Sequence, residues 1–165
     1  TLFRSCIVAF AHFLDIFEDK CTFMAIDGLH EAEMNFGTVK LKMIDVENIK
    51  NIDEDFELNT GSPHFVKYVE NLENFDVYKN GYAIRNSERY AQEGINVNFV
   101  EKTAENKIFV RTYERGVEDE TYSCGTGVTA CSLVYMLQNH VEKVDVKVLG
   151  VDMKKKRISL YVLRI

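Results

Sequence analysis

The sequence is poor in several features that mark large classes of protein. It has one proline, no tryptophan and no apolar run of the ~20 residues that a membrane-spanning helix needs. The opening residues, TLFRS, lead into a mixed amphipathic stretch, which predicts no signal peptide. One proline and nine glycines indicate no flexible linker or low-complexity segment. A membrane partner is therefore not expected.

Charge and cysteine content argue against several further kinds of partner and site. The net charge is −6, with 26 acidic and 20 basic residues, which argues against a nucleic-acid partner. The four cysteines lack metal-ligand spacing, and this indicates reduced thiols in a cytoplasmic protein with no metal site. The motif CGTG lacks the lysine of a phosphate-binding P-loop. No cofactor is expected.

A chain of 165 residues with 46% apolar content can form one ordinary domain or two small ones. Two stretches, at about 6–17 and 126–139, are apolar on nearly every face and predict buried helices. A weaker helix is expected at 83–90, and 45–59 is expected to be a loop with one short strand. Alternation predicts the strands 21–26, 30–36, 38–44, 65–69, 96–101, 107–113 and 144–149. This order predicts an α+β fold with sheets wrapped around central helices.

The stretch from Glu114 to Gly127 is the strongest candidate for chemistry. Its glycines would let the backbone turn tightly and approach a ligand, and Thr126 is a reasonable helix N-cap. Cys124 would then lie at the positive end of a helix dipole, which predicts a lowered thiol pKa. The free N–H groups of 125–127 could bind a carboxylate. Cys131, inside the helix, is expected to be an inert core residue.

Four motifs carry a resemblance to a known family. ERG and SCGTGVTAC, together with GSPHFV at 61–66 and GINVNFV at 94–100, resemble those of diaminopimelate epimerase, in the family's order. The resemblance runs from about Cys6 to Gly150. It implies two pseudo-symmetric halves, each a sheet rolled around one helix. Residues 1–43 would be a remnant of the first half, 44–150 the second half, and 151–165 a divergent tail.

The resemblance implies an activity and roles for individual residues. The family converts LL- to meso-diaminopimelate, a precursor of lysine and peptidoglycan, by proton transfer between two cysteines without a cofactor. Cys124 matches one catalytic cysteine, and Ser62 stands where many members have a substrate-contacting asparagine. The other matching positions are Gly125 and Thr126 as carboxylate-binding donors, Glu114 and Arg115 as a substrate-contacting pair, Asn96 as a substrate-binding residue, and His64 as a histidine near the cysteine.

The chain also departs from the family pattern. Cys6 matches the second cysteine of the first half, so the catalytic one would lie six positions earlier, before Thr1. We therefore expect an incomplete and inactive form of the enzyme. Two alternatives stay open: a non-catalytic remnant or amino-acid-binding module, and a relative of proline racemase or of phenazine-type isomerases. A homodimer is an open alternative for the oligomeric state.

Overall fold

The computed structural model describes residues 4–25, 28–150 and 158–161, and the side chains of 158–161 are not included in the description. The chain divides into two compact units, 1–45 and 46–165. We describe each unit by itself. Of the expected tail at 151–165, the structure describes only one short strand, and the rest lies outside the described residues.

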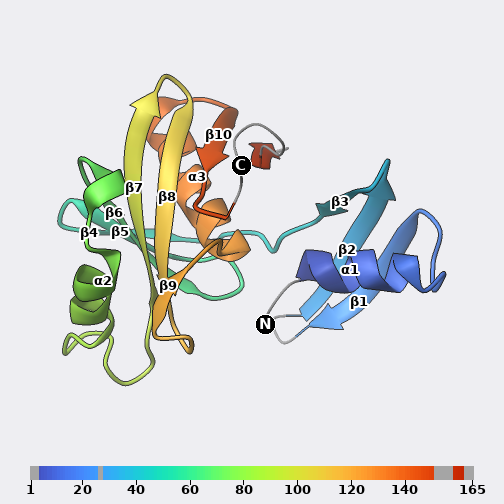
Figure 1. Ribbon diagram of the computed structural model, residues 1–165, viewed down its shortest axis with the longest axis horizontal. Coiled ribbons are helices and arrows are strands. Elements are labelled where there is room, and N and C mark those ends of the chain that lie inside the picture. The colour runs from blue at the N-terminus through green and yellow to red at the C-terminus, as the bar shows by residue number, and fades with distance from the viewer. Residues whose placement is uncertain (1–3, 26–27, 151–157, 162–165) are drawn as a thin grey trace. The chain divides into compact units, whose positions relative to one another are not determined.

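The first unit is one helix on a small antiparallel sheet (Figure 1). Helix α1 spans Arg4–Phe13, and the sheet has the order β1-β2-β3. The strands are β1 Lys20–Ala25, β2 Gly28–Asn35 and β3 Thr38–Leu41.

Burial of α1 differs from the sequence prediction. Val8 and Arg4 are buried, but Phe10 and Phe13 are 61% and 77% exposed. The expectation of a helix buried on every side is wrong for this unit, because one three-stranded sheet covers only one face of a helix.

The second unit is built on a mixed sheet of eight strands. Their order is β11-β10-β8-β7-β6-β5-β4, and β9 also pairs with β8. Two neighbouring pairs, β6 with β7 and β8 with β10, are parallel, and the other pairs are antiparallel. The bounds are β4 Ile49–Ile52, β5 Asp55–Asn59, β6 Pro63–Tyr68, β7 Asn96–Ala104, β8 Lys107–Glu114, β9 Asp119–Thr121, β10 Lys143–Lys147 and β11 Ile158–Tyr161. The segment expected to hold one short strand thus forms the β4–β5 hairpin.

Three helical segments belong to this unit: η1 Leu72–Asn74, α2 Val77–Arg85 and α3 Gly125–Asn139. The helix expected at 126–139 is confirmed as α3. The helix expected at 83–90 is wrong in position, because Asn80 and Gly81 lie inside α2 rather than breaking it. Gly81 fits there because a Cβ atom at this position would collide with the side chain of Tyr113.

The central strands are buried on both faces, and α2 and α3 cover opposite faces (Figure 1). Val66 and Val100 pack with α3 residues such as Val134, whereas Phe65 and Phe99 pack with Val77 of α2. Alternate residues of each strand therefore enter different cores, as the pleat requires. The α+β class predicted from the sequence is confirmed. Within the described residues, no helix has both the length and the apolar content to cross a membrane.

Candidate active site around Cys124

Four segments of the second unit bring polar side chains together at the N-terminus of α3. The parallel register of β6 and β7 places His64 beside Asn96. Both strands run in the same direction, so their first residues lie at the same end of the sheet. Thr126, in the first turn of α3, bonds to His64 on β6. All side chains that the motifs single out around Cys124 thus come from this one end of the unit.

Cys124 itself occupies the N-cap position of α3. Its backbone is extended, with φ −116° and ψ 108°, and its side chain makes no capping bond. The residue is only 8% exposed. The prediction that Thr126 is the N-cap is wrong: Thr126 is the second helical residue, and its hydroxyl lies 3.5 Å from the Cys124 sulfur.

The ionisation of Cys124 also differs from the sequence prediction. Burial raises the pKa of the Cys124 thiol, and the negative charge of Glu114 raises it further. The hydroxyl of Thr126 and the backbone N–H groups of Thr126 and Gly127 act in the opposite direction on this pKa. The helix start therefore does favour the thiolate, but the loss of hydration outweighs it. The predicted lowering of the pKa is wrong.

His64 is completely buried beside this helix start. Its Nε2 lies 2.9 Å from the hydroxyl of Thr126 and 3.0 Å from that of Ser62, and its Nδ1 lies 3.1 Å from the amide nitrogen of Asn98. Burial lowers the pKa of His64 to about 3, with a further lowering from the charge of Arg115. The ring is therefore neutral at physiological pH.

Asn96 ties the loop after β8 to the same cluster. Its amide nitrogen donates to the Ser62 hydroxyl at 3.2 Å and to the Pro63 carbonyl at 3.0 Å. Its oxygen accepts from the backbone N–H of Arg115 at 2.9 Å. The guanidinium of Arg115 donates to the Glu93 carbonyl at 3.0 Å. Asn96 is 5% exposed and is bonded within the protein on both sides of its carboxamide.

Asn98 is a buried polar residue at the site that the sequence motifs did not single out. It is fully buried, and its oxygen accepts a hydrogen bond from the Thr112 hydroxyl at 2.9 Å. The same oxygen lies against the Cα of Gly127, where a Cβ atom would collide with it. Asparagine is uncommon in strands, and a second one two positions after Asn96 on the same face was the available signal.

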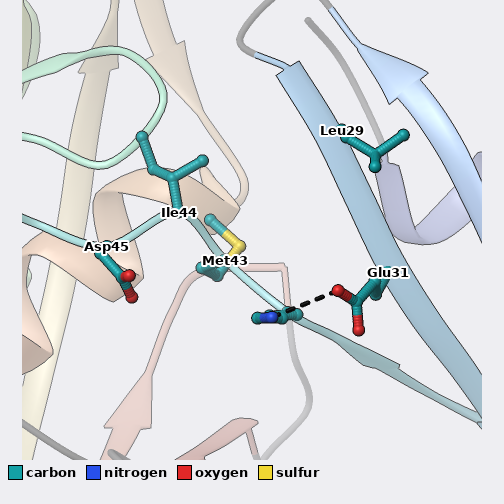
Figure 2. A pocket seen from close by; sticks show the side chains of 6 residues that line it. Leu29, Glu31, Met43, Ile44 and Asp45 are labelled. Atoms are coloured by element: carbon teal, nitrogen blue, oxygen red, sulfur yellow. Dashed lines mark hydrogen bonds and ion pairs between the residues drawn. The ribbon is translucent and has the colours of Figure 1, made fainter.

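One surface depression lies in the first unit and contains none of these residues. Its lining residues are Leu29, Glu31, Lys42, Met43, Ile44 and Asp45. Two of these residues, Lys42 and Glu31, form an ion pair 3.2 Å apart. Figure 2 marks it with a dashed line at Glu31. Within the described part of the chain, no group of three or more histidine, cysteine or acidic side chains is arranged to hold a metal ion. The Cys124 cluster is therefore the candidate active site.

Comparison with known proteins identifies the family of this chain. The sequence model of the diaminopimelate epimerase family matches residues 56–156, which include β6, β7, β8 and α3. The chain belongs to the diaminopimelate epimerase family. The matched range contains all eight positions to which the resemblance assigns a role.

The individual relatives that the chain matches are named diaminopimelate epimerase. The chain is 52% identical over 129 residues to the diaminopimelate epimerase of Flavobacterium psychrophilum. The matched region covers 78% of this chain and 50% of the relative. It is 43% identical over 154 residues to that of Aquifex aeolicus, covering 87% of this chain and 55% of the relative. It is also 43% identical over 145 residues to the diaminopimelate epimerase of a Hydrogenobaculum species. That match covers 80% of this chain and 52% of the relative. The chain thus spans about half the length of the curated relatives it matches.

Proposed function

We propose that the Cys124 cluster is one half of the acid–base centre of a diaminopimelate epimerase, which interconverts the LL and meso forms of its substrate. The observation that carries the proposal is the position of the Cys124 thiol. It lies at the start of a buried helix, 3.5 Å from a hydroxyl that is itself 2.9 Å from a neutral histidine. The names of the relatives, together with the family match over 56–156, supply the substrate.

The neighbouring groups would hold the substrate and assist proton transfer. Removal of a Cα proton creates negative charge, which preorganised donors stabilise. The N–H groups at Gly125 and Thr126 and the guanidinium of Arg115 are suited to the α-carboxylate. Glu114 would meet the substrate from the end of β8, next to the loop that begins at Arg115. Ser62 and Asn96 would support this loop and His64 through the hydrogen bonds described above.

Inversion needs a second acid on the opposite face of the substrate carbon. The other cysteine of the second unit, Cys131, is fully buried in the core and its pKa is raised well above the ordinary value, so it cannot serve. Loss of one general acid or base typically costs ~10²–10⁴-fold in rate. We therefore expect the 165-residue chain alone to exchange the Cα proton slowly and not to invert the centre.

Deuterium exchange tests the proposal. The chain is incubated with LL-diaminopimelate in D₂O under reducing conditions, and deuterium content and configuration are measured by mass spectrometry and chiral chromatography. Slow exchange with retained configuration, lost in Cys124→Ala and kept in the control Cys6→Ala, is the expected result. Inversion at rates typical of enzymes, roughly 1–10³ s⁻¹, would show that a second acid is present. Saturable binding without any exchange would contradict the proposal and favour the amino-acid-binding alternative.

A further inference from the structure

The orientation of the Asn98 carboxamide is fixed by its surroundings. Its nitrogen lies 2.9 Å from the carbonyl of Phe65, which can only accept, and its oxygen lies 2.9 Å from the hydroxyl of Thr112. Rotating the carboxamide by 180° would place two oxygens against each other at the Phe65 carbonyl. The group that faces Nδ1 of His64 at 3.1 Å is therefore an N–H donor.

This donor determines which ring nitrogen of His64 carries the proton. A nitrogen that accepts a hydrogen bond has no proton of its own, so Nδ1 is bare and a neutral ring is protonated at Nε2. The Nε2–H has two hydroxyl acceptors within reach, Thr126 at 2.9 Å and Ser62 at 3.0 Å. Because Ser62 already accepts from Asn96, the Thr126 hydroxyl is both the nearer and the less occupied acceptor, and the Nε2–H donates to it. A hydroxyl that accepts from the ring keeps its own proton for another acceptor. The Cys124 sulfur at 3.5 Å and the Ser62 hydroxyl at 3.3 Å are the two acceptors within reach.

We propose that Asn98 is a positioning residue, which holds His64 in the Nε2–H tautomer so that the Thr126 hydroxyl donates to the sulfur of Cys124. The bond becomes charge-assisted when Cys124 is a thiolate, and such bonds are about twice as strong as neutral ones. Ser62 Oγ already accepts from Asn96, which leaves the thiolate as the stronger competitor for the Thr126 proton. The relay thus stabilises the ionised sulfur without a charged histidine. It rests on the proposed function only in taking Cys124 as the reacting group.

The charged groups around this relay are the same in every variant proposed below. Glu114 raises the pKa of Cys124, and Arg115 disfavours the protonated form of His64. Glu114 is the last residue of β8 and Arg115 follows it, and neither side chain is among the hydrogen-bond partners of Asn98 described above. A change in the titration of Cys124 on removal of Asn98 would therefore come through the hydrogen bonds rather than from a lost charge.

The test is the pH dependence of Cys124 alkylation by iodoacetamide, followed by mass spectrometry of the folded chain. Asn98→Leu keeps the branching of the side chain but removes the donor. We expect its alkylation profile to move up by about one pH unit, which makes alkylation below the midpoint about ten-fold slower. Thr112→Val is the matched control, since it breaks the bond to the Asn98 oxygen and keeps the donor to His64. Its profile should stay where the unmodified chain has it.

A double-mutant comparison separates the relay from a general loosening of the site. In a Thr126→Val background, Asn98→Leu should produce no further shift, whereas Thr126→Ser should restore the dependence on Asn98. An equal shift in the Thr126→Val background, or the same shift from Thr112→Val, would overturn the proposal. Alkylation needs no substrate, so these results are independent of whether the chain exchanges the diaminopimelate proton.

The tautomer can also be observed directly in the unmodified chain. Two-bond ¹H–¹⁵N NMR spectra distinguish protonated from bare ring nitrogens, and His64→Gln assigns the signals. We expect a protonated Nε2 and a bare Nδ1 for His64. Protonation at Nδ1 would overturn the proposal, and this measurement decides it even where Asn98→Leu does not fold.

Discussion

The carboxamide oxygen of Asn98 lies where a Cβ atom at position 127 would have to be placed. This contact explains the second glycine of the CGTG sequence, which has no left-handed backbone angle to account for it. Gly125 differs, because a Cβ atom there would meet nothing within 4 Å. The two glycines of one short motif therefore have different structural reasons, and only the one at 127 is required for packing.

Alanine substitution at these two positions should have different effects on stability. Gly127→Ala should lower the free energy of unfolding by about 1–3 kcal/mol, because Asn98 or α3 must move to make room. Gly125→Ala should leave the free energy of unfolding unchanged or raise it by up to about 1 kcal/mol, since alanine favours the helix. Urea unfolding followed by circular dichroism measures both. Equal stabilities of the two variants would contradict the close approach of Asn98.

Burial of neutral His64 predicts a specific loss of stability in mild acid. Burial lowers its pKa to about 3 in the folded chain, against 6.5 for the ordinary group, so the unfolded chain binds more protons between these values. This contribution is fully present above pH 6.5 and is lost as the pH falls toward 3, at up to about 1.4 kcal/mol per pH unit. Unfolding at pH 7 and pH 5 should show the drop. His64→Gln, which cannot titrate, should show a clearly smaller drop, and an equal one would contradict the shift.

Three of the four thiols should react in an order set by exposure rather than by the helix start. Cys6 is exposed, Cys124 is 8% exposed with a pKa raised by burial, and Cys131 is fully buried with a pKa raised well above the ordinary value. At pH 7 we expect Cys6 to be alkylated before Cys124, and Cys131 only on unfolding. Peptide mass spectrometry over time gives the three rates. Faster labelling of Cys124 than of Cys6 would show that its thiolate is favoured after all.

Arg111 should matter far more for stability than other surface arginines. Its guanidinium forms a two-point pair with Glu120, at 2.6 and 2.7 Å, and donates to the carbonyls of Leu72 and Phe75 at 2.7 and 2.9 Å. Arg111→Lys keeps the charge but loses the fork geometry, and should cost about 2 kcal/mol. Arg89→Lys, at a pair with Glu57 in which the guanidinium is half exposed, should cost much less than Arg111→Lys. Thermal or urea unfolding compares the two variants.

The sequence predicts local elements well because their patterns are local. The strands around 96–113 and the helix from Gly125 onward could be read from alternation and from continuous apolar character. The position of α2 could not, because Gly81 looks like a break until Tyr113 is known to lie against it. That contact joins residues 32 positions apart, and periodicity within one segment carries no trace of it.

At the site, too, local sequence patterns predict some features, whereas others depend on contacts between distant parts of the chain. Its motif residues could be found because they stand together in recognisable stretches, and the dipole at Cys124 follows from the helix alone. The pKa of Cys124 could not be predicted, since the depth of burial depends on how β6, β7 and α3 pack. The part played by Asn98 was hidden for a related reason, because it follows from the pairing of β7 with β6 and from the distance to Gly127.

The parallel pairing of β6 with β7 has a consequence for how the chain must fold. Between Tyr68 and Asn96 runs a crossover that contains η1 and α2, so the ladder forms only after a long loop has closed. A slip of one residue would turn Asn96 and Asn98 toward the core under α2 and send Val97 and Phe99 toward α3. Two buried carboxamides would then lose their partners, and each unmet polar group costs about 1–3 kcal/mol. The polar residues of the site therefore specify the register of the β6–β7 pairing, because a misaligned sheet would leave them without hydrogen-bond partners.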